Sequence, residues 1–280
     1  MSKFDDVTRQ IKAQLEAGTP PWIKPWNGGG MPMPLRFNGE MYQGINVILL
    51  CMQGRTAPTW MTYRQAKEIG GQVRKGERGT SVCYSAPVTT KLPSGAEETY
   101  RCYRWYTVFN ADQIDGLPDK YQPPLVQDYI NTDPKDTVAD DLVSGTKADV
   151  RNGASKAYFN PTHDYINMPK FEDFRSALDY YSTLFHELVH WTGHKSRLER
   201  NFSRNKTDYA IEELVAEMGS AFLMAQLGLE AKVREDHASY IEHWLKALDN
   251  DSKFIFSAAS AASKAVNYIW EAQTAKKEAA

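Results

Sequence analysis

The stretch His186-Glu187-Leu188-Val189-His190 decides how the C-terminal half of the chain is built. It lies in an apolar run with the spacing of a buried helix, which ends at Gly193. Residues four apart share one face of a helix, so His186 and His190 project side by side and two imidazole nitrogens can bind one Zn²⁺. Glu187 is then next to the open coordination position, where it can act as general base on a water molecule. The pattern predicts a metal site of the metallopeptidase type.

A third ligand has to come from elsewhere in the chain. On a downstream helix, Glu213 and Glu217 share one face among apolar residues, where a buried acid needs a partner. This pair resembles the gluzincin arrangement, so we predict that Glu213 binds the metal and Glu217 steadies a ligand histidine, with the reverse order as an alternative. His194 is the third candidate, although the metzincin pattern would place its last histidine where the chain has Ser196.

Short strands and further helices are expected around this motif. Strands are predicted at 148–151, 156–160 and 165–168. The rest of this half is predicted to be mostly helical, with helices at about 171–192, 208–228, 235–248 and 252–273. Zincin-type proteases place a small sheet beside the metal helix, and its edge strand pairs with an extended substrate, so the three strands fit such a site. His237 and Tyr240 are in the right part of the chain to stabilise a transition state, but packing is the commoner role for such side chains.

The N-terminal half mixes short helices with two longer strands. Helices are predicted at 4–17, 44–53 and 63–69, and strands at 80–87 and 99–110 with a turn at 93–95. A segment rich in proline and aspartate follows. We therefore expect an α+β protein with a small N-terminal α+β domain at 1–117, a linker at 118–135, and a mainly helical domain with a small β-sheet at 136–280.

Composition excludes several classes of protein. The three cysteines are an odd number and form no CxxC pair, which argues against a disulfide framework or a thiolate metal site. No run of about 18 apolar residues could span a bilayer, and the first residues do not have the apolar region of a signal peptide. We expect a cytoplasmic protein with no membrane partner.

Aromatic and cationic side chains are interleaved in the N-terminal half. Single-stranded nucleic acid is bound by stacking of bases on aromatic faces while Lys and Arg follow the phosphates. The segment 74–79 is a cationic turn with two glycines that suits a phosphate contact. However, residues 1–125 hold only 15 Lys and Arg against 11 Asp and Glu, a modest excess. The residues that we predict to contact DNA are Trp22, Lys24, Trp26, Tyr42, Asn46, Arg74, Lys75 and Arg78.

Taken together, several blocks of sequence resemble the ArdC family of antirestriction proteins. In the N-terminal half these are 42–46, 60–66, 73–77 and 108–113, and in the C-terminal half 157–159, 185–194 and 209–223. The resemblance covers nearly the whole chain, and His186, Glu187 and His190 match the family's metal motif directly. It implies an N-terminal domain that binds single-stranded DNA, a C-terminal zinc-metallopeptidase-like domain, and protection of incoming DNA from host restriction.

Two functions of different kinds fit these observations. One is a DNA-tethered metallopeptidase that uses Zn²⁺, or another divalent metal such as Mn²⁺, to cleave a protein substrate linked to host restriction. The other is a non-catalytic protein that binds single-stranded DNA and whose metal only stabilises the fold. Glu187 favours the first, because a structural zinc site has four protein ligands and needs no base. A metal-dependent nuclease is disfavoured, because nucleases usually gather carboxylates around two metals.

Overall fold

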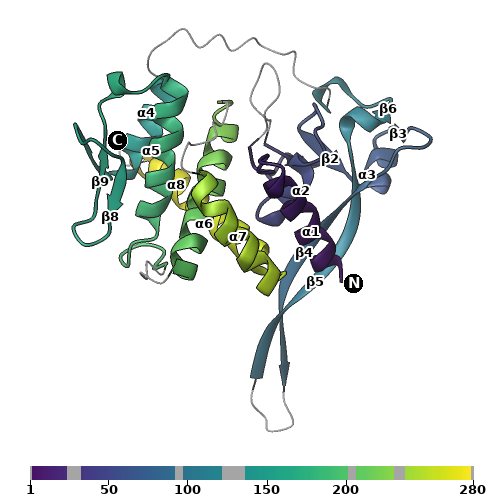
Figure 1. Ribbon diagram of the computed structural model, residues 1–280. Helices are drawn as coiled ribbons and strands as arrows, with labels where there is room; N and C mark the ends of the chain where they lie inside the picture. Colours follow the sequence, from purple (N-terminus) through teal and green to yellow (C-terminus); the bar gives the residue numbers. More distant parts are fainter. Residues whose placement is uncertain are drawn as a thin grey trace. The chain divides into compact units, whose positions relative to one another are not determined.

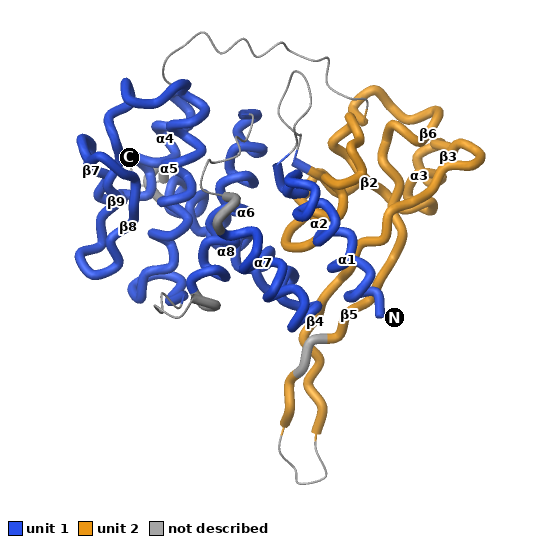
Figure 2. Tube along the Cα trace, viewed as in Figure 1, with its two compact units in different colours: residues 1–33, 126–280 blue, residues 34–125 orange. Residues whose placement is uncertain are grey.

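The computed structural model describes residues 2–23, 33–91, 97–121, 136–200, 206–229 and 237–278. The chain forms two compact units (Figure 2): residues 34–125, here called the sheet unit, and residues 1–33 with 126–280, here called the helical unit. Residues 1–33 thus group by their contacts with the C-terminal part, whereas the sequence prediction placed 1–117 in one domain. The predicted linker, 118–135, lies largely outside the described residues.

A four-stranded sheet organises the sheet unit (Figure 1). Its strands are β1 (Leu35–Arg36), β2 (Thr59–Met61), β4 (Thr80–Lys91) and β5 (Glu97–Asn110), in the order β1-β2-β5-β4. β1 is parallel to β2 and the other neighbours are antiparallel. β4 and β5 form a long hairpin that pairs from Thr80 opposite Val108 to Lys91 opposite Glu97. β4 continues beyond its predicted end at 87, β5 begins before its predicted start at 99, and the predicted turn at 93–95 lies outside the described residues.

Short elements cover the base of this sheet. Helix α2 (Ile45–Cys51) packs on β4, and helix α3 (Tyr63–Glu68) begins at a capping box in which the Thr62 hydroxyl accepts a hydrogen bond from the Gln65 amide. Both helices were predicted. Strands β3 (Gln72–Val73) and β6 (Ile114–Asp115) pair with each other, and the single turns η1 (Ala111–Gln113) and η2 (Asp119–Tyr121) complete the unit. A small core gathers the apolar side chains of Ala57, Met61, Ala66, Val73, Ala111, Ile114, Leu117 and Tyr121.

The helical unit surrounds helix α5 with further helices on one side and a small sheet on the other. Its helices are α1 (Lys3–Glu16), α4 (Thr137–Thr146), α5 (Ala177–Thr192), α6 (Lys206–Gln226), α7 (His237–Asn250) and α8 (Phe254–Glu278). α5 and α6 pack directly on each other, and α8 packs against both. The sequence prediction assigned no helix at α4. It began α5 at 171, but 171–173 forms the separate turn η3, and the Ser176 hydroxyl caps α5 by accepting from the Asp179 amide at 3.2 Å.

The small sheet of the helical unit has the strand order β7-β9-β8. β7 (Asp149–Asn152) runs parallel to β9 (Tyr165–Met168), and β8 (Tyr158–Asn160) is antiparallel to it. The three strands were predicted. β8 and β9 both pack against α5, which puts a sheet edge beside the helix that carries the two histidines. An α+β fold with a mainly helical C-terminal part is therefore confirmed.

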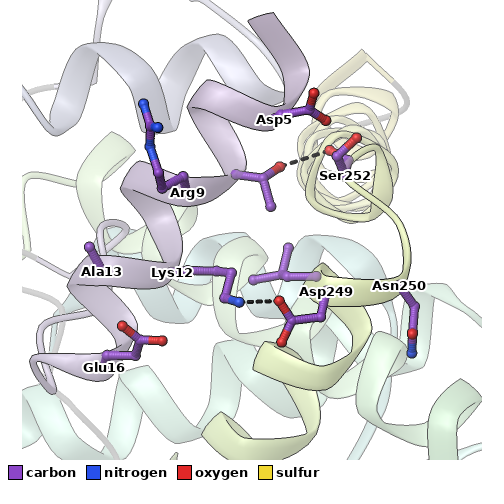
Figure 3. A pocket seen from close by; sticks show the side chains of 10 residues that line it. Asp5, Arg9, Lys12, Ala13, Glu16, Asp249, Asn250 and Ser252 are labelled. Carbon is purple, nitrogen blue, oxygen red and sulfur yellow. Dashed lines mark hydrogen bonds and ion pairs between the residues drawn. The ribbon is translucent and has the colours of Figure 1, made fainter. Parts of the chain in front are cut away.

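Helix α1 is amphipathic and packs on α7. It buries Val7, Ile11 and Leu15, and Trp22 beyond its end packs edge-on against Trp244 of α7, with ring centroids 5.9 Å apart. A hollow of about 570 Å³ remains beside the helix (Figure 3), and an ion pair between Lys12 and Asp249 crosses it. None of the helices that the structure describes is long and apolar enough to cross a membrane.

Candidate metal centre and nucleic-acid interface

Helix α5 holds His186 and His190 one turn apart on a buried face. Their side chains are almost inaccessible to solvent, and their ring centroids lie 4.7 Å apart. The two Nε2 atoms face each other at 3.1 Å. The sequence spacing alone required this side-by-side placement, because the residues are four apart on a regular helix. The structure adds that both rings present the same nitrogen to one point.

Glu213 of α6 brings a carboxylate to that same point. Its Oε2 lies 3.4 Å from Nε2 of His186, and its Oε1 lies 3.6 Å from Nε2 of His190. One ligand atom from each of the three residues can be chosen so that all lie within 4.8 Å of one another. Ligands about 2.0–2.1 Å from a tetrahedral metal lie about 3.4 Å apart. The 3.1–3.6 Å separations therefore fit a metal ion between them.

A close helix contact sets the position of Glu213. A Cβ atom added to Gly219 of α6 would lie 2.7 Å and 3.0 Å from the two methyl groups of Val189 on α5. The absence of a side chain at Gly219 lets the two helices approach closely. Glu213 is six residues before Gly219 on the same helix, so this approach brings its carboxylate to the histidines. Apolar neighbours on α6, including Leu214 and Met218, are fully buried against the core.

Two further acids of α6 face the outer nitrogens of the histidines. Oε1 of Glu217 lies 3.4 Å from Nδ1 of His186, a placement that suits the predicted role of steadying this histidine. Oε1 of Glu212 lies 3.1 Å from Nδ1 of His190, and the sequence reasoning assigned no role to this residue. Acids in this position fix the ring and tautomer of a metal-binding histidine. The EE pair at 212–213 was visible in the sequence, but the partner of its first acid was not.

Arg200 locks Glu212 in place. Its Nε donates to Oε2 of Glu212 at 2.9 Å and its Nη2 donates to Oε1 at 2.8 Å, a bidentate pair. The same guanidinium donates to the Thr192 hydroxyl at 2.8 Å and to the Val189 carbonyl at 2.6 Å, near the C-terminal end of α5. Arg200 therefore ties the end of α5 to the acid that orients His190. No sequence pattern pointed to Arg200.

The charges of this cluster depend on one another. Burial lowers the pKa of His190, but hydrogen bonds and charge from Glu212 and Glu213 outweigh burial and raise that pKa to about 10. Burial raises the pKa of Glu213, yet His186 and His190 more than compensate and hold it well below its usual range. In the same way His190 and Arg200 keep the pKa of Glu212 low despite burial. Without a metal, the cluster therefore holds ionised carboxylates around a protonated imidazole.

Glu187 is buried next to the first histidine and is held by the small sheet. Its Oε2 accepts a hydrogen bond from the backbone amide of Phe159 on β8 at 2.8 Å. Because Phe159 uses its amide in this direction, the side of β8 away from β9 faces the candidate site. The sequence prediction left open which strand forms the edge beside the site, and this contact assigns it to β8.

Among the described residues, the group of converging ligand atoms contains only His186, His190 and Glu213. His194 Nδ1 lies 2.8 Å from the Ser196 hydroxyl, and His194 is not part of the three-residue group. The side chain of His237 is outside the described residues. Tyr240 stacks on Trp244. Tyr209, which the sequence reasoning did not single out, is half-exposed, and its hydroxyl shares hydrogen bonds with Glu213 and Tyr240.

Three of the residues predicted to contact DNA are buried in the protein. Trp22 packs in the helical unit, and Tyr42 in the sheet unit is 2% exposed. The Asn46 amide donates to the Cys83 carbonyl at 2.7 Å and accepts from the Cys83 amide at 2.8 Å. It thereby pairs with the outer edge of β4 as a further strand would. These three side chains pack against or bond to other parts of the protein, whereas they were predicted to contact DNA bases.

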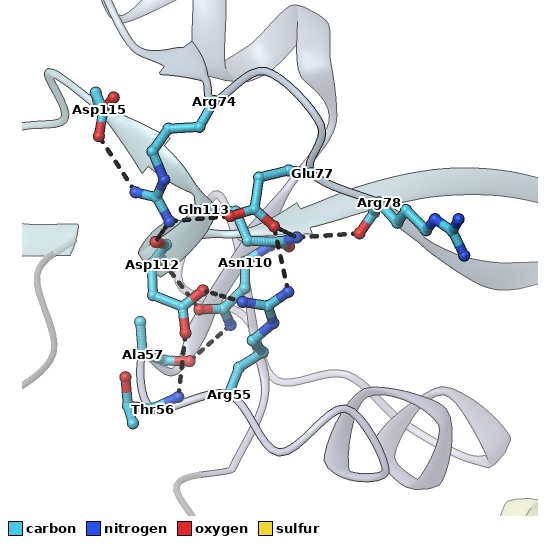
Figure 4. A network of polar contacts seen from close by, with 10 residues as sticks. All are labelled: Arg55, Thr56, Ala57, Arg74, Glu77, Arg78, Asn110, Asp112, Gln113 and Asp115. Atoms are coloured by element: carbon cyan, nitrogen blue, oxygen red, sulfur yellow. Dashed lines mark hydrogen bonds and ion pairs between the residues drawn. The ribbon is translucent and has the colours of Figure 1, made fainter.

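The cationic residues predicted to contact DNA differ in whether they are already paired with acids of the protein. Arg74 belongs to a polar network (Figure 4), in which it donates to Asp115 at 3.2 Å, to Glu77 at 3.1 Å and to the Asp112 carbonyl. Lys75 and Arg78 are exposed, and neither side chain forms an ion pair within the described part of the chain. Lys24 and Trp26 lie outside the described residues.

The fold and the site define a zincin-like protein with an additional N-terminal domain. A family model of zincin-like metallopeptidases matches residues 137–261, and one of the N-terminal domain of the anti-restriction factor ArdC matches residues 3–109. The metal-free crystal structure of antirestriction protein ArdC from plasmid R388 superposes with a TM-score of 0.85 at 45% identity, covering 98% of this chain and 99% of that one. The Mn(II)-bound structure of the same protein gives 0.82 at 44% identity, covering 98% of each. The chain belongs to the ArdC family of antirestriction proteins.

Two further relatives extend the comparison. Protein y4eC of Sinorhizobium fredii (strain NBRC 101917 / NGR234) is 35% identical over 97% of this chain and 92% of its own length. A DNA primase TraC of Escherichia coli is 37% identical over 95% of this chain. The chain spans 27% of the length of that primase.

Proposed function

We propose that this chain binds single-stranded DNA through its N-terminal part and carries a catalytic divalent-metal site in its helical unit. In this role it protects DNA that enters the cytoplasm on a mobile element from host restriction. The observation that supports it best is the convergence of His186 Nε2, His190 Nε2 and the Glu213 carboxylate, with Glu187 buried and next to His186 in the sequence. Family membership supplies the antirestriction context.

The roles of the residues follow from their placement. His186, His190 and Glu213 would hold the metal, leaving a fourth position for water as in catalytic zinc sites. A divalent cation at such a site polarises a carbonyl and acidifies bound water. Glu187 would accept the proton of that water. An extended protein segment would align along the outer edge of β8, whose Phe159 amide already points toward Glu187.

Imidazole and carboxylate ligands suit both Zn²⁺ and Mn²⁺. We propose Zn²⁺ as the resident ion because two imidazoles and one carboxylate are a common catalytic zinc set. The related ArdC of plasmid R388 has been crystallised with Mn(II), which keeps Mn²⁺ as the alternative. Metal analysis of the purified chain, followed by competition between the two ions, distinguishes them.

The test of the catalytic proposal is the variant Glu187→Gln. This change removes the base but none of the proposed ligands, so bound metal should be retained. We expect the variant to lose most protection when a plasmid enters a restricting recipient, while transfer into a recipient without restriction is unchanged. Full protection by a metal-loaded variant would establish instead a DNA-binding protein with a structural metal. Incubating plasmid DNA with the chain and Mg²⁺ or Mn²⁺ is expected to leave the DNA uncut, which separates this function from a nuclease.

A further inference from the structure

The hairpin β4–β5 exposes an aromatic and cationic face in its basal half. Tyr84 of β4 is directly opposite Arg104 of β5, and Tyr106 lies two residues beyond Arg104 on the same face. Tyr84 is 56% exposed, Tyr106 is 38% exposed, and Arg104 is exposed as well. We call these three residues the hairpin face. They are adjacent in space because of the antiparallel register, although Tyr84 is 20 positions from Arg104 in sequence.

Two members of the hairpin face have no polar partner in the part of the chain that the structure describes. Among the described residues, neither the Tyr84 hydroxyl nor the Arg104 guanidinium makes a hydrogen bond or an ion pair. Arg74 of the same unit, by contrast, is held by two carboxylates and a carbonyl. The Tyr106 hydroxyl shares a hydrogen bond with buried Tyr42, which anchors its ring. The face thus combines a fixed ring, a second exposed ring and a cation that forms no ion pair with the described residues.

The composition of the hairpin changes along its length. Towards its distal end, the residues whose side chains the structure describes include the exposed Thr89, Thr90, Lys91, Glu97 and Glu98. The basal half instead exposes the tyrosine rings of the hairpin face to solvent. Solubility does not require tyrosine at these positions, because Thr, Lys or Glu would provide it. Exposed aromatic side chains next to an unpaired arginine are typical of surfaces that bind a partner.

The geometry favours one kind of partner. Same-face residues on a strand lie about 7 Å apart, so a base can stack on each tyrosine with a phosphate near Arg104 between them. Stacking of this kind needs bases that are free of a duplex. The charge of Arg104 complements a phosphate, and no acid among the described residues forms an ion pair with it.

We propose that the hairpin face, Tyr84, Arg104 and Tyr106, is a contact surface for single-stranded DNA. The proposal rests on the proposed DNA-binding function and names the surface that carries it. It replaces the buried residues Tyr42 and Asn46 as base-contacting groups. Tyr42 then acts indirectly, by holding the hydroxyl of Tyr106.

The experiment measures binding of the full chain to a fluorescently labelled oligothymidylate by anisotropy. An oligonucleotide of about 20 nucleotides exceeds the ~4–16 nucleotides that one binding module covers. The test variant is Tyr84→Ala with Arg104→Ala. The matched control is Tyr63→Ala with Arg64→Ala, which removes the same residue types from α3, where Tyr63 is 48% exposed and the Arg64 side chain is 89% exposed. Circular dichroism and thermal unfolding of all proteins verify folding.

We expect the test variant to bind about tenfold or more weakly and the control variant to bind within about twofold of the unchanged chain. The single variant Arg104→Ala should reduce the slope of log affinity against log salt by about 0.7, the value for one phosphate contact on a single strand. Tyr84→Trp should bind at least as tightly as the unchanged chain, because it keeps a stacking ring.

The outcomes separate this proposal from the function on which it rests. If the unchanged chain does not bind the oligonucleotide, the DNA-binding function itself is wrong. If the unchanged chain binds and the test variant binds equally well, the function stands and the hairpin face is not the contact surface. An equal loss in the test and control variants also overturns the assignment, since it would reflect only lost charge and aromatic surface.

Discussion

His190 and Glu212 form a contact in the candidate metal centre that Arg200 holds in place. Nδ1 of the imidazole lies 3.1 Å from Oε1 of the carboxylate, which Arg200 grips with two hydrogen bonds of 2.8 Å and 2.9 Å. The contact leaves Nε2 of His190 directed at His186 and Glu213. The orientation of a ligand is therefore set by residues that do not touch the metal position.

Glu212→Gln is expected to weaken metal binding about 10- to 100-fold, because the charged acceptor that orients His190 is lost. Affinity is measured by competition with a chromophoric chelator. Glu242→Gln is the matched control, since Glu242 is an exposed acid of α7 paired with Lys246. Unchanged affinity in the Glu212 variant would mean that the backbone alone positions the ring.

Alanine substitutions should identify the third ligand. We expect His190→Ala and Glu213→Ala to abolish stoichiometric metal after dialysis, and Glu217→Ala to retain metal with about 10- to 100-fold lower affinity. His194→Ala should retain full metal content, because its Nδ1 pairs with Ser196. Elemental analysis measures the metal content of all four variants. Loss of metal in the His194 variant would contradict the ligand set.

Metal binding should release a proton at neutral pH. With its pKa raised to about 10, His190 is protonated in the metal-free protein, and a metal ligand has to be neutral. Affinity should therefore rise about tenfold per pH unit between pH 7 and pH 9. Calorimetric titrations in two buffers of different ionisation enthalpy count the proton directly. Binding heats that do not depend on the buffer would show that His190 is already neutral.

The substitution Gly219→Ala should lower the free energy of unfolding in the unchanged chain and raise it in a Val189→Ala background. Gly219→Ala places a methyl group against Val189, a cost of about 1–3 kcal/mol, which outweighs the gain of about 1 kcal/mol in helix propensity. In a Val189→Ala background the clash is removed, so the same substitution should raise the free energy of unfolding. Denaturant unfolding of the four proteins measures this cycle. Equal effects in both backgrounds would mean that α5 and α6 do not approach closely here.

Asn46→Ala tests a structural role against the predicted DNA contact. Removing the side chain leaves the amide and carbonyl of Cys83 without partners on the outer edge of β4, which should cost about 2–4 kcal/mol of stability. DNA affinity per folded molecule should not change. Asn38→Ala, at an exposed position where the side chain accepts one solvent-exposed hydrogen bond from the Glu40 amide, is the control and should cost less than about 1 kcal/mol. A fully stable variant with reduced DNA affinity would restore the sequence-based prediction.

Local patterns made much of this chain predictable. Helix periodicity placed His186 next to His190, and Glu213 next to Glu217, because side chains four apart share a face whatever the rest of the chain does. The elements α2, α3 and the three strands of the small sheet follow from runs of apolar residues and turn residues. The similarity of several ordered blocks identified the family.

The patterns failed where burial depends on distant segments. Trp22, Tyr42 and Asn46 belong to types of residue that bind DNA when exposed, but each is covered by a segment far away in sequence. The ion pair between Arg200 and Glu212 spans a stretch whose course no local rule predicts. The hairpin face was equally hidden, because only the register of β4 and β5 brings Tyr84 opposite Arg104.

By itself, the sequence determined which residues share a helical face, the elements that carry them, and the family. Only the tertiary structure decided which acids reach each imidazole nitrogen, which aromatic rings are exposed, and that helix α1 packs with the C-terminal unit. The reason is physical. Shared faces follow from helical and strand repeats a few residues long, whereas exposure and pairing depend on how whole elements pack against each other.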